Sequence, residues 1–156
     1  MRFCLIALMT LLVGSQAFAG PIAPREGWAV HDTELSHAEL FERLKAAVKA
    51  EGLIIVTRAG PTKAAARRGI SIPDNMVVGV YNNDFAVRAL GFSTAAMIEA
   101  PIRFYLTGDG DGTATLSYKT PSHVFAPYFG EGGQGLRDLA AELDARFAAI
   151  AAATID

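Results

Sequence analysis

The chain has 156 residues, with 14 lysines and arginines against 16 aspartates and glutamates and a net charge of −2 at pH 7. This weakly acidic balance argues against nucleic acid as a partner, because proteins that bind nucleic acid neutralise phosphates with clustered basic residues. Hydrophobic residues make up 51% of the chain, which is enough apolar surface to stabilise one ordinary domain by burial.

The first nineteen residues have the pattern of a secretory signal peptide. Arg2 supplies a positive charge, residues 3–13 form an apolar run, and Ala17-Phe18-Ala19 places small residues where a signal peptidase requires them. The apolar run is too short for a stable membrane-spanning helix, and no later segment is long and apolar enough to cross a bilayer. We therefore expect cleavage after Ala19 and a periplasmic or secreted protein; an uncleaved anchor is the less favoured alternative.

Cleavage at this position would also change the chemistry of the protein. Cys4 is the only cysteine and lies within the segment removed, without the spacing of a lipoprotein cleavage site. The mature chain would then lack disulfides, thiolate nucleophiles and cysteine-ligated zinc, which suits an oxidising compartment. We expect residues 20–27 to be an extended leader and residues 28–156 to be a single domain.

The first half of this domain shows alternating strand and helix patterns. Ser36 and Glu39 have capping-box spacing and predict a helix that Gly52 ends. A β-branched run at 53–57 predicts a buried strand. The other elements expected here are a strand from 28 to 32, a short helix from Pro61 to Arg68 ended by Gly69, a strand from 76 to 81, a helix capped by Asn82 or Asn83 and stopped by Gly91, and a helical turn from 94 to 99.

The second half contains the clearest strand pair. Apolar and polar residues alternate over 102–107 and again over 113–118, and the glycine- and aspartate-rich segment 108–112 between them predicts a tight turn. A short aromatic segment follows at 124–129, then a mobile glycine-rich loop at 130–135 and an amphipathic last helix. The antiparallel pairing with helices unevenly interspersed indicates an α+β fold, a mainly antiparallel sheet covered by helices on one side.

No catalytic or metal-binding motif stands out. The three histidines lack the spacing of a metal site, and Met76 and Met97 are better explained by packing. The Asp109-Gly-Asp111-Gly sequence lacks the later ligands of a calcium loop. Ser122 is better explained as a helix cap than as a nucleophile. We therefore predict no cofactor, metal site or catalytic residue.

Aromatic residues gather late in the chain. Ordinary packing explains them, but they also suit an apolar pocket in which tyrosine hydroxyls orient a ligand, with the glycine-rich loop as a lid. Arg103 and Lys119 would supply charge for an anionic ligand. The candidate ligand-binding residues are Arg103, Tyr105, Tyr118, His123, Phe125 and Tyr128.

Several short motifs together resemble domain-of-unknown-function family 302. They are the helix from Glu39 to Gly52, the strand from Met76 to Tyr81 followed by Asn82, the run Ala100-Pro101-Ile102-Arg103, the turn Asp109-Gly-Asp-Gly, and Ser117-Tyr118-Lys119-Thr120-Pro121. Asn83 stands where that family usually has proline. The resemblance implies a β-α-β(4)-α plan similar to that of the TATA-binding protein, and it implies no activity.

The pattern favours an exported, non-catalytic binding domain for a small apolar or anionic molecule, or for another protein of the cell envelope. One alternative is an enzyme or a metal or redox accessory protein that uses His123 with Tyr118 or Tyr128. Another is a structural module that forms a homodimer through a sheet edge or a helix face.

Overall fold

The computed structural model describes residues 22–156, so the expected signal peptide lies outside the described residues. Five strands form one antiparallel sheet in the order β1-β5-β4-β3-β2. The strands are β1 (Trp28–Thr33), β2 (Ile54–Ala59), β3 (Asn75–Tyr81), β4 (Ile102–Gly108) and β5 (Ala114–Lys119). The helices are α1 (His37–Ala50), α2 (Thr62–Ala66), α3 (Asn83–Phe92), η1 (Ala95–Glu99), α4 (Pro121–Phe125), η2 (Ala126–Tyr128) and α5 (Phe129–Ile155).

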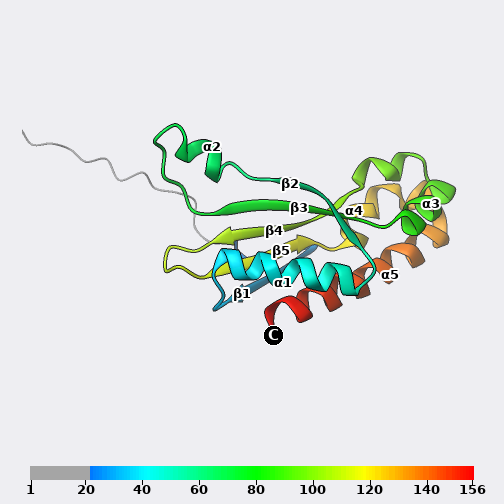
Figure 1. The fold of residues 1–156 in the computed structure, drawn as a ribbon. Coiled ribbons are helices and arrows are strands. Elements are labelled where there is room, and N and C mark those ends of the chain that lie inside the picture. Colours follow the sequence, from blue (N-terminus) through cyan, green and yellow to red (C-terminus); the bar gives the residue numbers. More distant parts are fainter. Residues whose placement is uncertain (1–21) are drawn as a thin grey trace, which may run out of the picture.

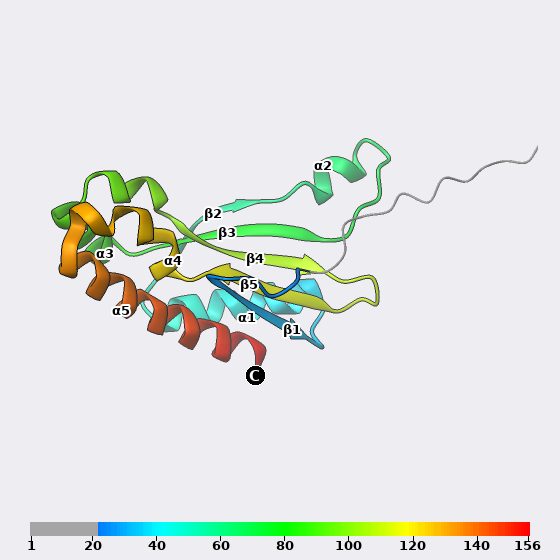
Figure 2. The same cartoon turned by 180° about the vertical axis from the view of Figure 1, so that it is seen from behind.

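The two long helices, α1 and α5, build the core with one face of the sheet. Helix α1 lies in front of the strands in Figure 1 and behind them in Figure 2. Alternate residues of β4 point into the core, and Phe104 is fully buried there against Phe147 of α5, with ring centroids 4.6 Å apart. Tyr118 of β5 meets both rings at centroid distances of 5.2 and 5.5 Å. This arrangement confirms the expected α+β architecture.

The predicted start of α1 is confirmed in detail. Ser36 Oγ accepts a hydrogen bond from the Glu39 amide at 3.3 Å, and Glu39 Oε2 accepts one from the Ser36 amide at 3.1 Å. The Ser36 hydroxyl also donates to Glu39 Oε2, at 2.6 Å, and this bond together with the one from the Ser36 amide lowers the pKa of the Glu39 carboxyl, since both favour its charged form. Gly52 ends the helix region with a φ of 73°.

The β2 strand exists as predicted, but the expectation that it is buried is wrong. β2 is an edge strand with its outer side unpaired among residues 22–156, and Ile54 and Val56 are 60% and 46% exposed. Beyond it, α2 stands at the end of the β2–β3 pair far from α3 (Figure 1). A β-branched run suits an edge strand as well as a central one, because both need extended backbone.

The glycine-rich segment at 130–135 is also not the loop we expected. It forms the first turns of α5, with a break at Gly133, whose φ of 58° and ψ of −150° are non-helical. Gly132 is buried, and a Cβ at Gly135 would lie 2.3 Å from the Phe92 ring, so glycine permits close packing here. The expected mobile lid is therefore absent from this segment.

Two helix ends also differ from expectation. Thr120, rather than Ser122, caps α4 by accepting a hydrogen bond from the His123 amide. Ser122 instead binds Asp144 of α5 through its amide, at 2.9 Å, and through its hydroxyl. Helix α3 continues past Gly91 to Phe92, and its expected cap at Asn82 is confirmed.

Candidate functional site

The face of the sheet opposite α1 and α5, called here the open face, carries the other half of each strand's side chains. The register of β4 and β5 pairs Phe104 with Tyr118, which places Arg103 and Lys119 side by side on the open face. Lys119 is paired in turn with Trp28 of β1. One row across the sheet therefore presents two cations and a tryptophan.

The next row along the strands is apolar and aromatic. It consists of Val77 of β3, Tyr105 of β4, Ser117 of β5 and Val30 of β1, which are paired in that order. Asn75 lies one row further and donates a hydrogen bond from Nδ2 to the Tyr105 hydroxyl oxygen. Because Tyr105 accepts this bond, its own hydroxyl hydrogen remains available to a ligand.

Most of these side chains, but not Ser117 or Val30, line a groove of about 430 Å³, called here the cationic groove. Its walls include Trp28, Val77, Arg103, Tyr105 and Lys119. The volume lies within the range typical of small-molecule sites, roughly 300–1,000 Å³. The groove thus combines a flat apolar surface with two positive charges.

The charges in the groove are only partly compensated. Within residues 22–156, neither Arg103 nor Lys119 forms an ion pair. Lys119 Nζ and Arg25 Cζ lie 5.7 and 5.3 Å from the centroid of the Trp28 ring, in cation–π contact. Two cationic side chains, Arg103 and Lys119, therefore line the groove, and a third, Arg25, lies against its Trp28 ring.

A single carboxylate, Glu99, lines the same groove. Its Oε1 accepts a hydrogen bond from the Tyr128 hydroxyl at 2.8 Å. This bond raises the pKa of Tyr128, with further contributions from burial and from the charges of Glu99 and Glu131. Tyr128 therefore stays protonated and holds Glu99 at the groove.

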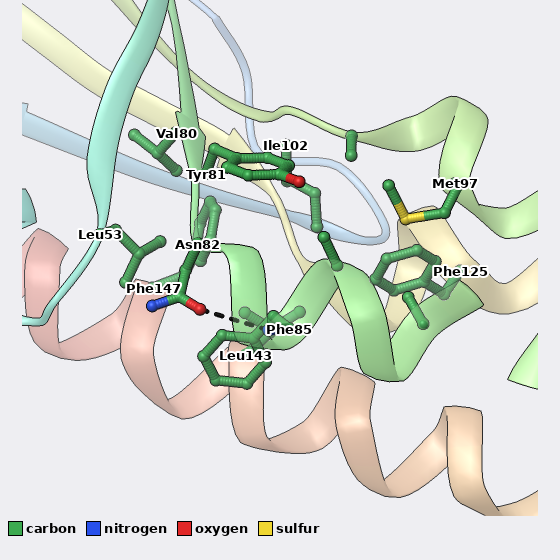
Figure 3. A pocket seen from close by; sticks show the side chains of 13 residues that line it. Leu53, Val80, Tyr81, Asn82, Phe85, Met97, Ile102, Phe125, Leu143 and Phe147 are labelled. Atoms are coloured by element: carbon green, nitrogen blue, oxygen red, sulfur yellow. Dashed lines mark hydrogen bonds between the residues drawn. The ribbon is translucent and has the colours of Figure 1, made fainter. Parts of the chain in front are cut away.

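A smaller apolar cavity of about 40 Å³ lies between α3, α5 and the neighbouring ends of β3 and β4 (Figure 3). The side chains around it include Phe85, Met97, Ile102, Phe125 and Phe147. The nearby Asn82 is occupied as the cap of α3, since its Oδ1 accepts from the amides of residues 84 and 85 and its Nδ2 donates to the Gly52 carbonyl.

The candidate residues chosen from the sequence divide among these places. Arg103, Tyr105 and Tyr118 line the cationic groove. Tyr118 is only 5% exposed, however. Burial raises the pKa of its hydroxyl, and the negative charge of Asp144 raises it further. Phe125 lines the apolar cavity, and Tyr128 reaches the groove through its bond to Glu99.

His123 does not line either hollow. It is exposed, and its ring lies so close to Gly27 that a Cβ there would be 2.1 Å from Nδ1. Its place is therefore beside the leader, not in the groove.

Sequence reasoning missed Trp28, Asn75, Val77 and Glu99 as groove residues. Asn75 and Val77 alternate with core residues of β3, and this period of two could have indicated them. Trp28 joins the groove only through the pairing of β1 with β5, which no local pattern indicates.

A third hollow of about 810 Å³ lies between the start of α1 and the segment formed by the end of β2, α2 and the start of β3. Its lining mixes charges of both signs, among them Glu42, Asp74, Arg43 and Arg58. The guanidinium of Arg58 lies 5.4 Å from the centroid of the Phe41 ring. Because its positive and negative side chains balance, this hollow is a weaker candidate for a ligand site than the cationic groove.

Within 22–156 there is no group of three or more histidine, aspartate or glutamate side chains that could hold a metal ion. In the same range, no helix combines the length and the apolar character needed to cross a membrane.

Comparisons with known proteins identify the family. No curated protein matches the chain. Among solved structures, an uncharacterized conserved DUF302 protein from Bacillus stearothermophilus is similar, with a TM-score of 0.73 and 19% sequence identity over 83% of this chain and 98% of that chain. At this identity the likeness shows the fold alone. The model of the family "Domain of unknown function DUF302" matches residues 29–154. The chain therefore belongs to the DUF302 family.

Proposed function

We propose that this protein is an exported, non-catalytic binding domain whose cationic groove takes up a small organic anion. One observation carries the proposal: Arg103 and Lys119 stand side by side on adjacent strands, line one groove, and have no ion-pair partner within residues 22–156.

The pairing of these two cations has an energetic consequence. Side chains directly opposite each other on antiparallel strands have Cβ atoms about 5 Å apart, and like charges in such pairs destabilise the sheet. An anion placed between Arg103 and Lys119 would relieve this repulsion and gain charge-assisted hydrogen bonds. Anion binding would therefore raise the free energy of unfolding of the protein.

The remaining walls of the groove favour an anion with an apolar or aromatic body. Trp28 and Tyr105 offer ring surfaces, Val77 offers an aliphatic one, and the Tyr105 hydroxyl offers one hydrogen-bond donor. A fully hydrated inorganic anion would leave these surfaces unused. An organic carboxylate uses both the charge and the apolar area.

The groove contains its own reporter, because Trp28 is the only tryptophan of the chain. Titration of benzoate, phenylacetate and hexanoate should change the Trp28 fluorescence, and calorimetry should give the same Kd. Arg103→Gln and Lys119→Gln should each weaken binding by about tenfold or more, since a hydrogen bond to a charged group contributes about 1.5–3 kcal/mol.

Lys63→Gln is the matched control, because Lys63 is a cation of α2 that does not line the groove. This variant should bind like the unmodified protein. Absence of binding by every anion in the panel, or equal loss in all three variants, would show that the groove is not an anion site. In that case an envelope protein becomes the better candidate for the open face.

The proposed export has a separate test. N-terminal sequencing of the protein recovered from the envelope or the medium should begin at Gly20, as the Ala17-Phe18-Ala19 pattern predicts. A protein that retains residues 3–13 would contradict export by cleavage without affecting the binding proposal.

A further inference from the structure

We infer that the cationic groove and the apolar cavity bind the two ends of one amphiphile, an unbranched aliphatic carboxylate. The carboxylate would lie between Arg103 and Lys119, and the end of the hydrocarbon chain would enter the cavity of Figure 3. This inference rests on the proposed function and specifies the class of its ligand.

The two hollows are neighbours that have lining residues in common or adjacent in the chain. Ile102 lines both of them. Two pairs of consecutive residues each have one member in either hollow. In the first pair Glu99 lines the groove and Ala100 lines the cavity, and in the second Val124 lines the groove and Phe125 lines the cavity. The charged site and the apolar one therefore adjoin at the start of β4 and along α4.

The chemistry of the cavity selects hydrocarbon. Its wall is formed mainly by aliphatic and aromatic side chains, and the amide of Asn82 is already bonded to backbone groups of α3 and to Gly52. The Tyr81 hydroxyl is the other polar side-chain group of the lining, so a polar ligand atom would lose its hydration there for at most this one partner, which is costly. Methylene and methyl groups have no hydrogen bonds to water to lose when they enter the cavity.

The size of the cavity limits how much of the chain it accepts. A space of about 40 Å³ holds on the order of three small groups, since one such group needs roughly 10–15 Å³ by this measure. The wall on the α3 side is lined by Ala86 and Ala89, whose small side chains leave this space open. We therefore expect the cavity to bury two or three carbons.

This arrangement predicts a chain-length dependence with a plateau. In a series of straight-chain acids from acetate to decanoate, each carbon buried in the cavity should tighten binding about fourfold. The gain should continue for two or three carbons and then stop, for a total of roughly 50-fold. A flat series, or a steady gain over all lengths, would overturn the inference.

Methyl NMR of the unmodified protein locates the chain directly. Met97 lines the cavity, whereas Met76 lines the distant hollow beside α1 and serves as an internal control. Octanoate should shift the Met97 methyl signal and leave the Met76 signal in place, and acetate should shift neither. An unmoved Met97 signal at saturating octanoate would overturn the inference, whatever the behaviour of any variant.

A pair of alanine substitutions tests the cavity by filling it. Ala89→Val should remove most of the chain-length gain while acetate binding stays unchanged. Ala47→Val is the control, because Ala47 is a similarly buried helical alanine on α1 that does not line the cavity. Equal chain-length gains in the two folded variants would contradict the inference.

The two proposals fail in different ways. If Arg103→Gln leaves the binding of every acid unchanged, the proposed function itself is wrong. If Arg103→Gln weakens all acids equally but the chain-length series is flat, the groove binds anions and only the role of the cavity is refuted.

Discussion

The three buried rings beneath the groove should be energetically coupled, and this can be measured. Phe104 lies on β4 between the groove residues Arg103 and Tyr105, with its own side chain on the core face. Its ring is stacked on Phe147 at 4.6 Å with an interplanar angle of 12°. This contact joins the floor of the groove to α5.

We expect Phe104→Leu and Phe147→Leu each to lower the free energy of unfolding by about 1–2 kcal/mol, because leucine retains most of the apolar volume but loses the ring contact. The double variant should lose less than the sum of the two. Each single substitution already removes the stacking of Phe104 on Phe147. The sum of the two single losses in unfolding free energy therefore counts that contact twice. The expected coupling is about 0.5–1.5 kcal/mol.

Urea unfolding monitored by circular dichroism gives the four free energies of the cycle. Asp111→Ala combined with Phe104→Leu is the control pair, because Asp111 is exposed in the β4–β5 turn and lies more than roughly 13 Å along the strand from Phe104. The control pair should be additive. A coupling below about 0.3 kcal/mol for Phe104 and Phe147 would refute a cooperative ring cluster.

Two further predictions concern helix starts. Ser36→Ala should lower the free energy of unfolding by about 1 kcal/mol at pH 7. Since the fold lowers the pKa of Glu39, the stability this carboxylate adds is present above its ordinary value of 4.5 and is lost as the pH falls through the lowered value. The difference between the variant and the unmodified protein should therefore narrow at pH 3, and an equal difference at both pH values would contradict this account. Gly133→Ala should cost about 1–3 kcal/mol, because its backbone conformation is nearly restricted to glycine. Gly130→Ala, at the first residue of the glycine-rich segment and with open space around it, should be neutral or stabilising. Equal melting temperatures for the two variants would disprove the break at Gly133.

Local patterns predicted most of the secondary structure. The hairpin followed from the period of two in Ile102, Phe104 and Leu106, and the start of α1 followed from the capping box at Ser36. In each case the information lies within a few residues, so the sequence was sufficient.

The glycine-rich start of α5 could not be predicted in the same way. Glycine has low helix propensity, so the segment read locally as a loop. Its helix depends instead on contacts with distant parts of the chain, such as the Phe92 ring against Gly135. Tertiary packing decided the outcome against the local preference.

The candidate site was predictable only in part for a related reason. Arg103 and Tyr105 share a strand, and the hairpin brings Lys119 beside them, so these residues could be associated from the sequence. Trp28 enters through long-range pairing, and Glu99 through its bond to Tyr128. Tyr118 alternates onto the core face, as its position opposite Phe104 requires.

The position of β1 in the sheet has a consequence for the order of folding. The first strand pairs with the last, and the Asp32–Thr115 hydrogen bond joins residues 83 positions apart in the chain. The sheet therefore cannot close, and the Trp28 side of the groove cannot form, until the chain is available as far as Lys119. Such non-local pairing slows folding. In a chain exported as we propose, this delay would favour an unfolded polypeptide during its passage across the membrane.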